Sequence, residues 1–287
     1  MFRKISFRQG RRSVLRGGWL IAALFFCPAL FAEPLPLEIG LVPNVSPRAL
    51  FRAYQPMREY LEKTLQRPVR LYTATDFKDF FMRTAKGEFD LVVTPPHFAR
   101  AAQVDAGYVP MLQYQADLVA ILVAPQGGVT DVDALRGKRL AVPGEVALAT
   151  LLAERALMKR GLKMGVDVVV HHHSAHNNAV LSLKRNEADA AVVGSGPFLL
   201  MPADTRAGIH IIAELGRGPN ATFMANPRLN KETIQALRQA LEHFAETDDG
   251  QAFMSRYGYQ GFKPVTIKQL AAMDELATAA KRTMGLY

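Results

Sequence analysis

Short apolar segments alternate with amphipathic segments of ten or more residues through most of the chain. The series begins with an apolar segment at 37–42, a segment with apolar residues at helical spacing at 47–65, an apolar segment at 69–73 and a helical segment at 76–86. Strands and helices that alternate in this way form right-handed βαβ units on a mainly parallel sheet. The alternation therefore predicts an α/β fold.

A break at Pro125–Gly128 divides these units into two sets. The second set includes an expected strand at 166–171 and ends with one at 210–213. A strand at 221–224 and three helices follow, of which the last is expected to run from Thr266 to Met284.

The chain therefore leaves the first set near residue 120 and returns to it near residue 220. We predict that residues 33–120 together with 218–287 form lobe 1 and that residues 121–217 form lobe 2. Two crossings between lobes make a hinge, and a cleft lies between the lobes.

Residues 1–32 have the layout of a secretory signal peptide. A basic stretch from Arg3 to Arg16 precedes an apolar stretch that ends at Ala32, the expected cleavage site. The apolar run is about 14 residues long, against the roughly 20 that a membrane-spanning helix needs. The pair Arg11-Arg12 matches a twin-arginine signal in part, which leaves both the Tat and the Sec route open. We expect a soluble periplasmic protein.

The formal net charge of +9 comes mostly from this segment. Without it, 29 Lys and Arg face 26 Asp and Glu, which removes the case for a nucleic-acid partner. The one cysteine, Cys27, excludes a disulfide framework and a Cys-ligated metal. The sequence has no G-x-S-x-G motif, no Walker A motif and no cysteine nucleophile. We expect a binding protein that uses no cofactor, and not an enzyme.

Six short motifs follow one another after the signal peptide. They are Gln55 to Lys63 with Arg67-Pro68-Val69, Thr75-Asp76-Phe77, Gly87 to Leu91, Asp133 to Arg139, Ser174 to Val180 and Asn186 to Ala191. In order and spacing they resemble the phosphate-, phosphite- and phosphonate-binding proteins of ABC importers, which have the type II periplasmic binding protein fold. The resemblance covers about residues 37–280. It implies a periplasmic protein that captures a small oxyanion by closing two lobes.

The resemblance also implies a partner, an ABC permease in the inner membrane. Proteins of this fold also serve as input modules of histidine kinases, so ligand sensing is the alternative to transport. A carboxylate or a metal-associated anion is the alternative ligand. Binding proteins of this fold are commonly monomers, and we expect a monomer here.

In the family that the chain resembles, the N–H groups of a helix N-terminus hold the anion, together with nearby Ser and Thr hydroxyls. The corresponding residues here are Gly144, Glu145, Val146 and Ala147, and the hydroxyls are absent. The carboxylate of Glu145 would repel an anion. Either Glu145 turns to solvent and the backbone amides bind alone, or the ligand is not a dianion.

Four further candidates follow from the resemblance. His176 matches a family histidine that contacts the anion, and the adjacent Asn177 offers an amide donor. Phe77 and Thr94 stand where the family has tyrosines in the cleft. We expect these four residues to contact the ligand.

Two more residues are candidate ligand contacts, and one run of histidines raises the alternative of a metal site. His97 opens a helix at the carboxyl end of a strand, where ligands bind in open α/β sheets. Ser195 offers a hydroxyl where some family members hold their ligand with acidic residues. In an extended strand, His171 and His173 share a face and invite a metal interpretation. No H-E-x-x-H motif or cysteine accompanies them, so we expect a solvated run of histidines and no metal site.

Overall fold

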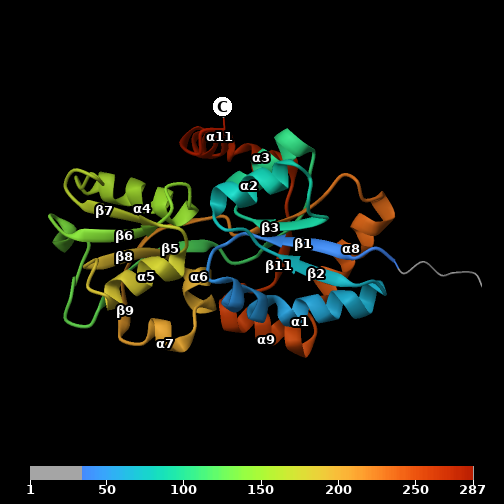
Figure 1. Cartoon of the computed structure of the whole chain (residues 1–287), viewed down its shortest axis with the longest axis horizontal. Helices are drawn as coiled ribbons and strands as arrows, with labels where there is room; N and C mark the ends of the chain where they lie inside the picture. The colour runs from blue at the N-terminus through green and yellow to red at the C-terminus, as the bar shows by residue number, and fades with distance from the viewer. Residues whose placement is uncertain (1–33, 287) are drawn as a thin grey trace, which may run out of the picture. The chain divides into compact units, whose positions relative to one another are not determined.

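The computed structural model describes residues 34–286, and these residues form one sheet of six strands and one of five (Figure 1). The predicted signal peptide, its cleavage site at Ala32 and Cys27 lie outside the described residues. Every helix in the described part of the chain is too short or too polar to cross a membrane.

The six-stranded sheet is mixed. Its spatial order is β11 (Phe262–Pro264), β4 (Val109–Tyr114), β10 (Thr222–Ala225), β3 (Leu91–Thr94), β1 (Leu37–Leu41) and β2 (Val69–Tyr72). β1 pairs in parallel with β2 and β3, while β10 runs antiparallel between β3 and β4. β11 is antiparallel to β4 at the edge.

Helices cover both faces of this sheet. α1 packs with α8 and α9, and α3 packs with α2, α10 and α11. In Figure 1, α1 and α9 lie below the sheet, and α2, α3 and α11 lie above it. Their bounds are α1 Pro47–Leu65, α2 Phe77–Ala85, α3 Pro96–Ala106, α8 Lys231–Phe244, α9 Asp248–Tyr257, α10 Ile267–Ala271 and α11 Asp274–Thr283.

The five-stranded sheet has the spatial order β7 (Val169–His173), β6 (Arg139–Pro143), β8 (Ala190–Gly194), β5 (Leu118–Pro125) and β9 (Ile209–Gly218). β6 is parallel to β7 and β8, whereas β5 is antiparallel to β8 and β9. The remaining elements are a 3-10 turn at Asp133–Leu135, α4 Leu148–Lys159, α5 His176–Lys184, α6 Ser195–Leu200 and α7 Ala203–Arg206.

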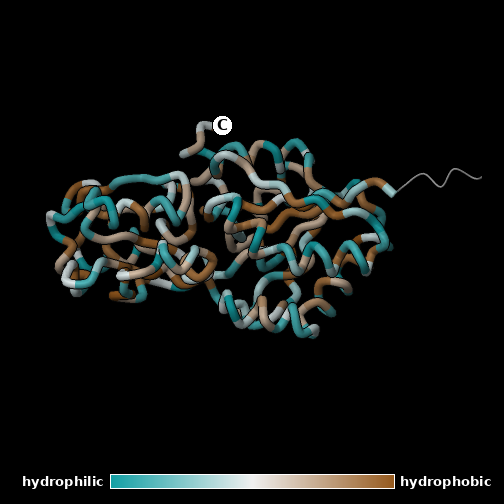
Figure 2. Tube along the Cα trace, turned by 60° about the horizontal axis from the view of Figure 1, so that its bottom comes forward, coloured by the Kyte–Doolittle hydropathy of each residue, from teal (hydrophilic) through white to brown (hydrophobic). Residues whose placement is uncertain are grey.

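α4 and α5 lie on opposite faces of the five-stranded sheet, and successive residues of each strand point to one face and then to the other. Leu122 and Val192 belong to the core that α4 completes, while their neighbours Val123 and Val193 belong to the core that α5 completes. The second core continues into the six-stranded sheet and includes residues of α1 and α9. Figure 2 shows the hydrophobic strands inside and helices that alternate between hydrophilic and hydrophobic turns outside.

The chain passes between the sheets twice, after β4 and before β10, and hydrogen bonds join the two crossings. The side-chain amide of Asn220 donates to the carbonyl of Ala116 at 3.0 Å. The side-chain amide of Gln113 donates to the carbonyl of Asn220 at 2.9 Å. The crossings therefore lie side by side at one place.

The structure differs from the sequence prediction in the direction of several strands. The sheets are mixed and not mainly parallel, because β5, β9, β10 and β11 run against their neighbours. A chain that returns to its first sheet enters that sheet without the helical crossover that parallel pairing requires.

Two local predictions also need correction. The expected helix from Thr266 to Met284 is interrupted, because α10 ends at Ala271 and α11 starts afresh at Asp274. The strand expected at 166–171 instead spans Val169–His173, where it pairs with β6. The division into lobes at residues 120 and 218 stays a prediction.

Candidate ligand-binding site

A cavity of about 30 Å³ lies where elements of the two sheets meet. The six-stranded sheet contributes residues of β1, α1, α2, β3 and α3, and the five-stranded sheet contributes residues of β5, α4, α5 and α6. The residues that line the cavity include Leu41, Asn44, Tyr54, Phe77, Ala147, Leu148, Ala149, His176, Pro197, Asn220 and Tyr259. One ordered water needs roughly 10–15 Å³, so the cavity suits a small ligand.

His176 supplies a buried hydrogen-bond donor to this cavity. The residue is 3% exposed, and its backbone N–H donates to the carbonyl of Asn44, which leads into α1, at 3.0 Å. Its ring Nδ1 accepts the backbone N–H of Gly194 at 3.1 Å. This bond assigns the ring proton to Nε2 in the neutral tautomer. Burial lowers the pKa of His176 to about 3, so the imidazole stays neutral and presents one N–H.

The N-terminus of α4 reaches the same cavity. The turn before it is closed by two backbone bonds, from Gly144 N–H to His173 at 2.6 Å and from Ala147 N–H to Gly144 at 3.2 Å. The N–H groups of a first helical turn have no partner inside the helix. Ala147, Leu148 and Ala149 line the cavity here with apolar side chains.

Phe77, at the start of α2, also lines the cavity and sets the form of this turn. Gly144 has a φ of 22°, and a Cβ at that position would lie 3.1 Å from Cδ2 of Phe77. The turn before α4 therefore favours glycine, because a side chain here would be strained by the positive φ and would press on the Phe77 ring.

Glu145 points away from the cavity. Its side chain is 59% exposed, and one carboxylate oxygen lies 3.8 Å from Nε2 of His172 on β7. Of the two alternatives that the sequence left open, this geometry is the one in which Glu145 turns to solvent and leaves the backbone amides to act alone.

His97 and Val146 lie beside the cavity and contact each other. His97 is fully buried, and its Nε2 lies 2.9 Å from the carbonyl oxygen of Val146. Burial lowers the pKa of His97 to about 4, so this neutral ring donates its N–H to the carbonyl. The structure thus gives His97 a protein partner.

The other three predicted residues lie outside the cavity. Thr94 borders a separate small cavity of about 10 Å³ among the phenylalanines of α2 and α3. The hydroxyl of Ser195 accepts the backbone N–H of Val119 at 3.2 Å. Asn177 borders an open groove of about 440 Å³, which β1–α1 loop residues and Ser174 also line. Ligand contacts by these three residues stay predictions.

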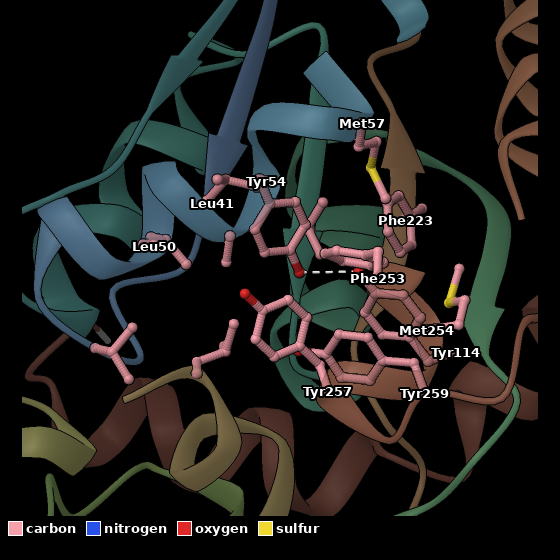
Figure 3. Close-up of a cluster of buried hydrophobic side chains, with 14 of the residues drawn as sticks. Leu41, Leu50, Tyr54, Met57, Tyr114, Phe223, Phe253, Met254, Tyr257 and Tyr259 are labelled. Carbon is pink, nitrogen blue, oxygen red and sulfur yellow. Dashed lines mark hydrogen bonds between the residues drawn. The ribbon is translucent and has the colours of Figure 1, made fainter. Parts of the chain in front are cut away.

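The sequence analysis missed the tyrosines of the site. Tyr54 and Tyr259 line the cavity, and the hydroxyl of Tyr54 lies 2.9 Å from that of Tyr114 (Figure 3). Tyr114 and Tyr259 stack with ring centroids 3.7 Å apart. Burial raises the pKa of Tyr54 to about 12 and that of Tyr259 well above its usual value. In sequence, Tyr54 lies on the apolar stripe of a helix, which predicts only a core residue.

The run His171–His173 lies on β7. Within the described residues, no three His, Cys, Asp or Glu side chains come together in an arrangement that would hold a metal ion. His172 instead faces Glu145, as described above.

Comparison with known proteins also points to a binding protein for small anions. Residues 39–270 match the family model described as "ABC transporter, phosphonate, periplasmic substrate-binding protein". The structure is similar to PhnD1 from Prochlorococcus marinus, solved with methylphosphonate, with a TM-score of 0.74, 12% identity, and coverage of 88% of this chain and 99% of that chain.

Two further solved structures are similar. One is a binding-protein component of an ABC phosphonate transporter from Pseudomonas aeruginosa, with a TM-score of 0.75, 13% identity and 88% of each chain covered. The other is the alkanesulfonate-binding protein SsuA from Xanthomonas axonopodis pv. citri bound to MOPS, with a TM-score of 0.58, 19% identity, and coverage of 89% of this chain and 95% of that chain. These likenesses confirm the predicted fold class.

Proposed function

Because this chain belongs to the family of periplasmic substrate-binding proteins of ABC phosphonate transporters, we propose that it captures a small phosphonate-like oxyanion in the cavity between its two sheets. The family predicted from the six motifs is thereby confirmed. Members of this family act in the periplasm and serve an inner-membrane permease, so a binding role and a periplasmic location hold for this chain.

The observation that carries the proposal is the pairing of two donors at one cavity. The first helical turn of α4 offers backbone N–H groups and the positive end of a helix dipole, which favour an anion. The Nε2–H of His176 faces the same space from α5. We propose Ala147, His176 and Phe77 as ligand contacts, with Gly144 as the residue that shapes the turn.

The ligand would bridge two lobes that move about the paired crossings. We propose the division predicted from the sequence, with residues 33–120 and 218–287 in lobe 1 and residues 121–217 in lobe 2. The two sheets, each with its own helices, support this division. A ligand that contacts both lobes stabilises the form in which they meet.

The role of binding without turnover is also a proposal. Its support is the family match and a cavity whose donors need only to hold the anion. A permease as partner follows from the family, whereas docking on a histidine kinase is the alternative that the sequence left open. We propose a monomer that is cleaved near Ala32. Light scattering and mass spectrometry of the exported protein test these two points.

A thermal-shift screen of the chain from Glu33 onward tests the proposed function. The panel holds phosphate, phosphite, methylphosphonate, sulfate, methanesulfonate, acetate and divalent cations. A ligand that binds only the folded state at 100 times its Kd stabilises it by about 2.7 kcal/mol. We expect a rise in melting temperature with at least one phosphorus or sulfur oxyanion, and phosphorus NMR should recover the anion unchanged. A response to metal or acetate alone would contradict the proposal.

A further inference from the structure

The cavity differs from an ordinary oxyanion site in the side chains at the helix N-terminus. Ala147, Leu148 and Ala149 belong to the start of α4, and they line the cavity with methyl and isobutyl groups. The hydroxyl of Thr150 in this turn is buried and donates to the carbonyl of Pro143 at 2.6 Å, so it is not free to bind a ligand. An oxyanion that enters here meets backbone N–H groups on one side and apolar surface on the other.

No lining side chain compensates for a full negative charge. Among the described residues that line the cavity, none is Lys, Arg, Asp or Glu. The titratable side chains there are His176, which burial keeps neutral, and Tyr54 and Tyr259, which burial keeps protonated. The helix end contributes the equivalent of roughly half a positive charge. Dipoles of this strength suit one negative charge, and a second would be buried without a partner.

The donor that complements α4 is built into the fold. The Nδ1 of His176 is occupied by the N–H of Gly194, the residue lines the cavity at 3% exposure, and its Nε2 has no hydrogen-bond partner among the described residues. An N–H donor on a side chain with so little exposure is poorly solvated unless a ligand or an ordered water accepts its proton. His176 is therefore an observation, independent of the helix end, that points to a ligand with an acceptor oxygen.

Most of the remaining wall is apolar, and its side-chain amides are those of Asn44 and Asn220, of which Asn220 is bonded to Ala116. Leu41, Phe77, Tyr54 and Pro197 line the cavity together with Leu148. Tyr54 of α1 lies beside the stacked rings of Tyr114 and Tyr259 (Figure 3). A methyl-sized substituent fills such a space without leaving a polar group unpaired, and the small volume leaves no room for a long chain.

We propose that the cavity takes a singly charged oxyanion carrying a small apolar group and excludes dianions of the same shape. This inference rests on the proposed function and narrows its ligand. It assigns selectivity to the apolar first turn of α4 and to the neutral donor of His176.

Two ligands of nearly the same shape test the charge preference. Methanesulfonate carries one negative charge throughout, whereas methylphosphonate loses its second proton near neutral pH, as a phosphate monoester does at about pH 6. Calorimetric titration of the wild-type protein from pH 5.5 to 8.5 should give a constant affinity for methanesulfonate. The affinity for methylphosphonate should fall about tenfold for each pH unit above its second pKa.

The outcomes separate the two proposals. Tighter binding of methylphosphonate at pH 8.5 than at pH 5.5 would overturn the charge preference and leave the proposed function standing. A methanesulfonate affinity that also falls with rising pH would show that His176 takes up a proton, which overturns its role as a neutral donor. Binding of neither ligand, nor of any oxyanion in the screen, would overturn both proposals.

A substitution in α4 tests the assignment to residues. Leu148→Thr places a hydroxyl at the cavity and should raise methylphosphonate affinity at pH 8.5 by roughly tenfold, the effect of one hydrogen bond to a charged group. Leu151→Thr makes the same chemical change in the same helix, outside the cavity lining, and is the matched control. Equal affinities for the two variants would overturn the assignment to the first turn.

Discussion

The imidazole Nε2 of His97 lies 2.9 Å from the carbonyl oxygen of Val146. His97 belongs to α3, beside the six-stranded sheet, and Val146 precedes α4, beside the five-stranded sheet. Both residues are buried, so water does not compete for this hydrogen bond. The bond fixes the loop that positions the first turn of α4, and with it the donors of the cavity.

Removal of this bond should disturb both stability and binding. His97→Ala leaves the carbonyl of Val146 buried without a donor, which costs about 1–3 kcal/mol. We expect a lower melting temperature and weaker binding of the ligand found in the screen. His97→Gln, which keeps an N–H donor, should recover part of both losses. Denaturant unfolding and calorimetry provide the measurements, and wild-type affinity in His97→Ala would contradict the prediction.

His176 should matter for the ligand and little for the fold. His176→Ala removes the Nε2–H donor from the cavity, and we expect ligand affinity to fall about tenfold or more. His172→Ala is the matched control, because that imidazole is exposed beside Glu145. Calorimetry measures affinity, and circular dichroism checks that both variants fold. Equal affinities for wild type and His176→Ala would remove His176 from the site.

The two buried histidines predict acid destabilisation. The pKa is lowered to about 4 in His97 and to about 3 in His176, whereas an unfolded histidine titrates near 6.5. Below pH 6.5 the unfolded chain binds protons that the folded protein does not, so the free energy of unfolding falls as the pH falls towards 4. For His97 the loss is on the order of 3 kcal/mol.

Denaturant titrations at pH 7, 5.5 and 4 measure this effect. The variant with both His97→Gln and His176→Gln provides the comparison, since it lacks the two titrating groups. Its stability should depend less on pH over this range than that of the wild type. Parallel curves for the two proteins would show that neither histidine carries the effect.

The turn before α4 should be sensitive to a single methyl group. Gly144→Ala places a Cβ 3.1 Å from the Phe77 ring at a positive φ, and we expect a loss of about 1 kcal/mol or more in stability together with weaker binding. Gly161→Ala is the control, because its φ is 69° but no atom lies within 4 Å of the added Cβ. The control should lose stability and keep its affinity. If the two variants bound ligand equally well, the turn would not shape the site.

Local patterns in the sequence predicted most of the helices. The stripe that contains Leu50, Tyr54 and Leu61 predicted α1 within its observed bounds. Apolar residues that recur every 3.6 positions lie on one face of a helix, and that face is the one that becomes buried. The interruption of the last helix at Met273 was not visible, because residues on both sides favour helix. Strand direction was not visible either, since it depends on which sheet the chain returns to.

The site was predictable only where a motif specified it. His176 was identified from its motif, and it lines the cavity, while its contact with a ligand stays a prediction. His97 was placed correctly at the end of a strand, but no local signal indicates that the loop before α4 packs over it. Tyr259 follows the helix α9, far along the chain from the other lining residues, and only the tertiary fold brings it to the cavity.

The hydrogen bonds by which Asn220, in the second crossing, holds the first crossing have a mechanical consequence. Because its side chain holds Ala116 and its carbonyl accepts from Gln113, neither crossing can change its backbone course without the other. In the proposed closure of the two lobes, the two crossings would therefore move together at Asn220. A displacement that slid one crossing along the other would have to break these two bonds, whereas a bend of both crossings together would keep them.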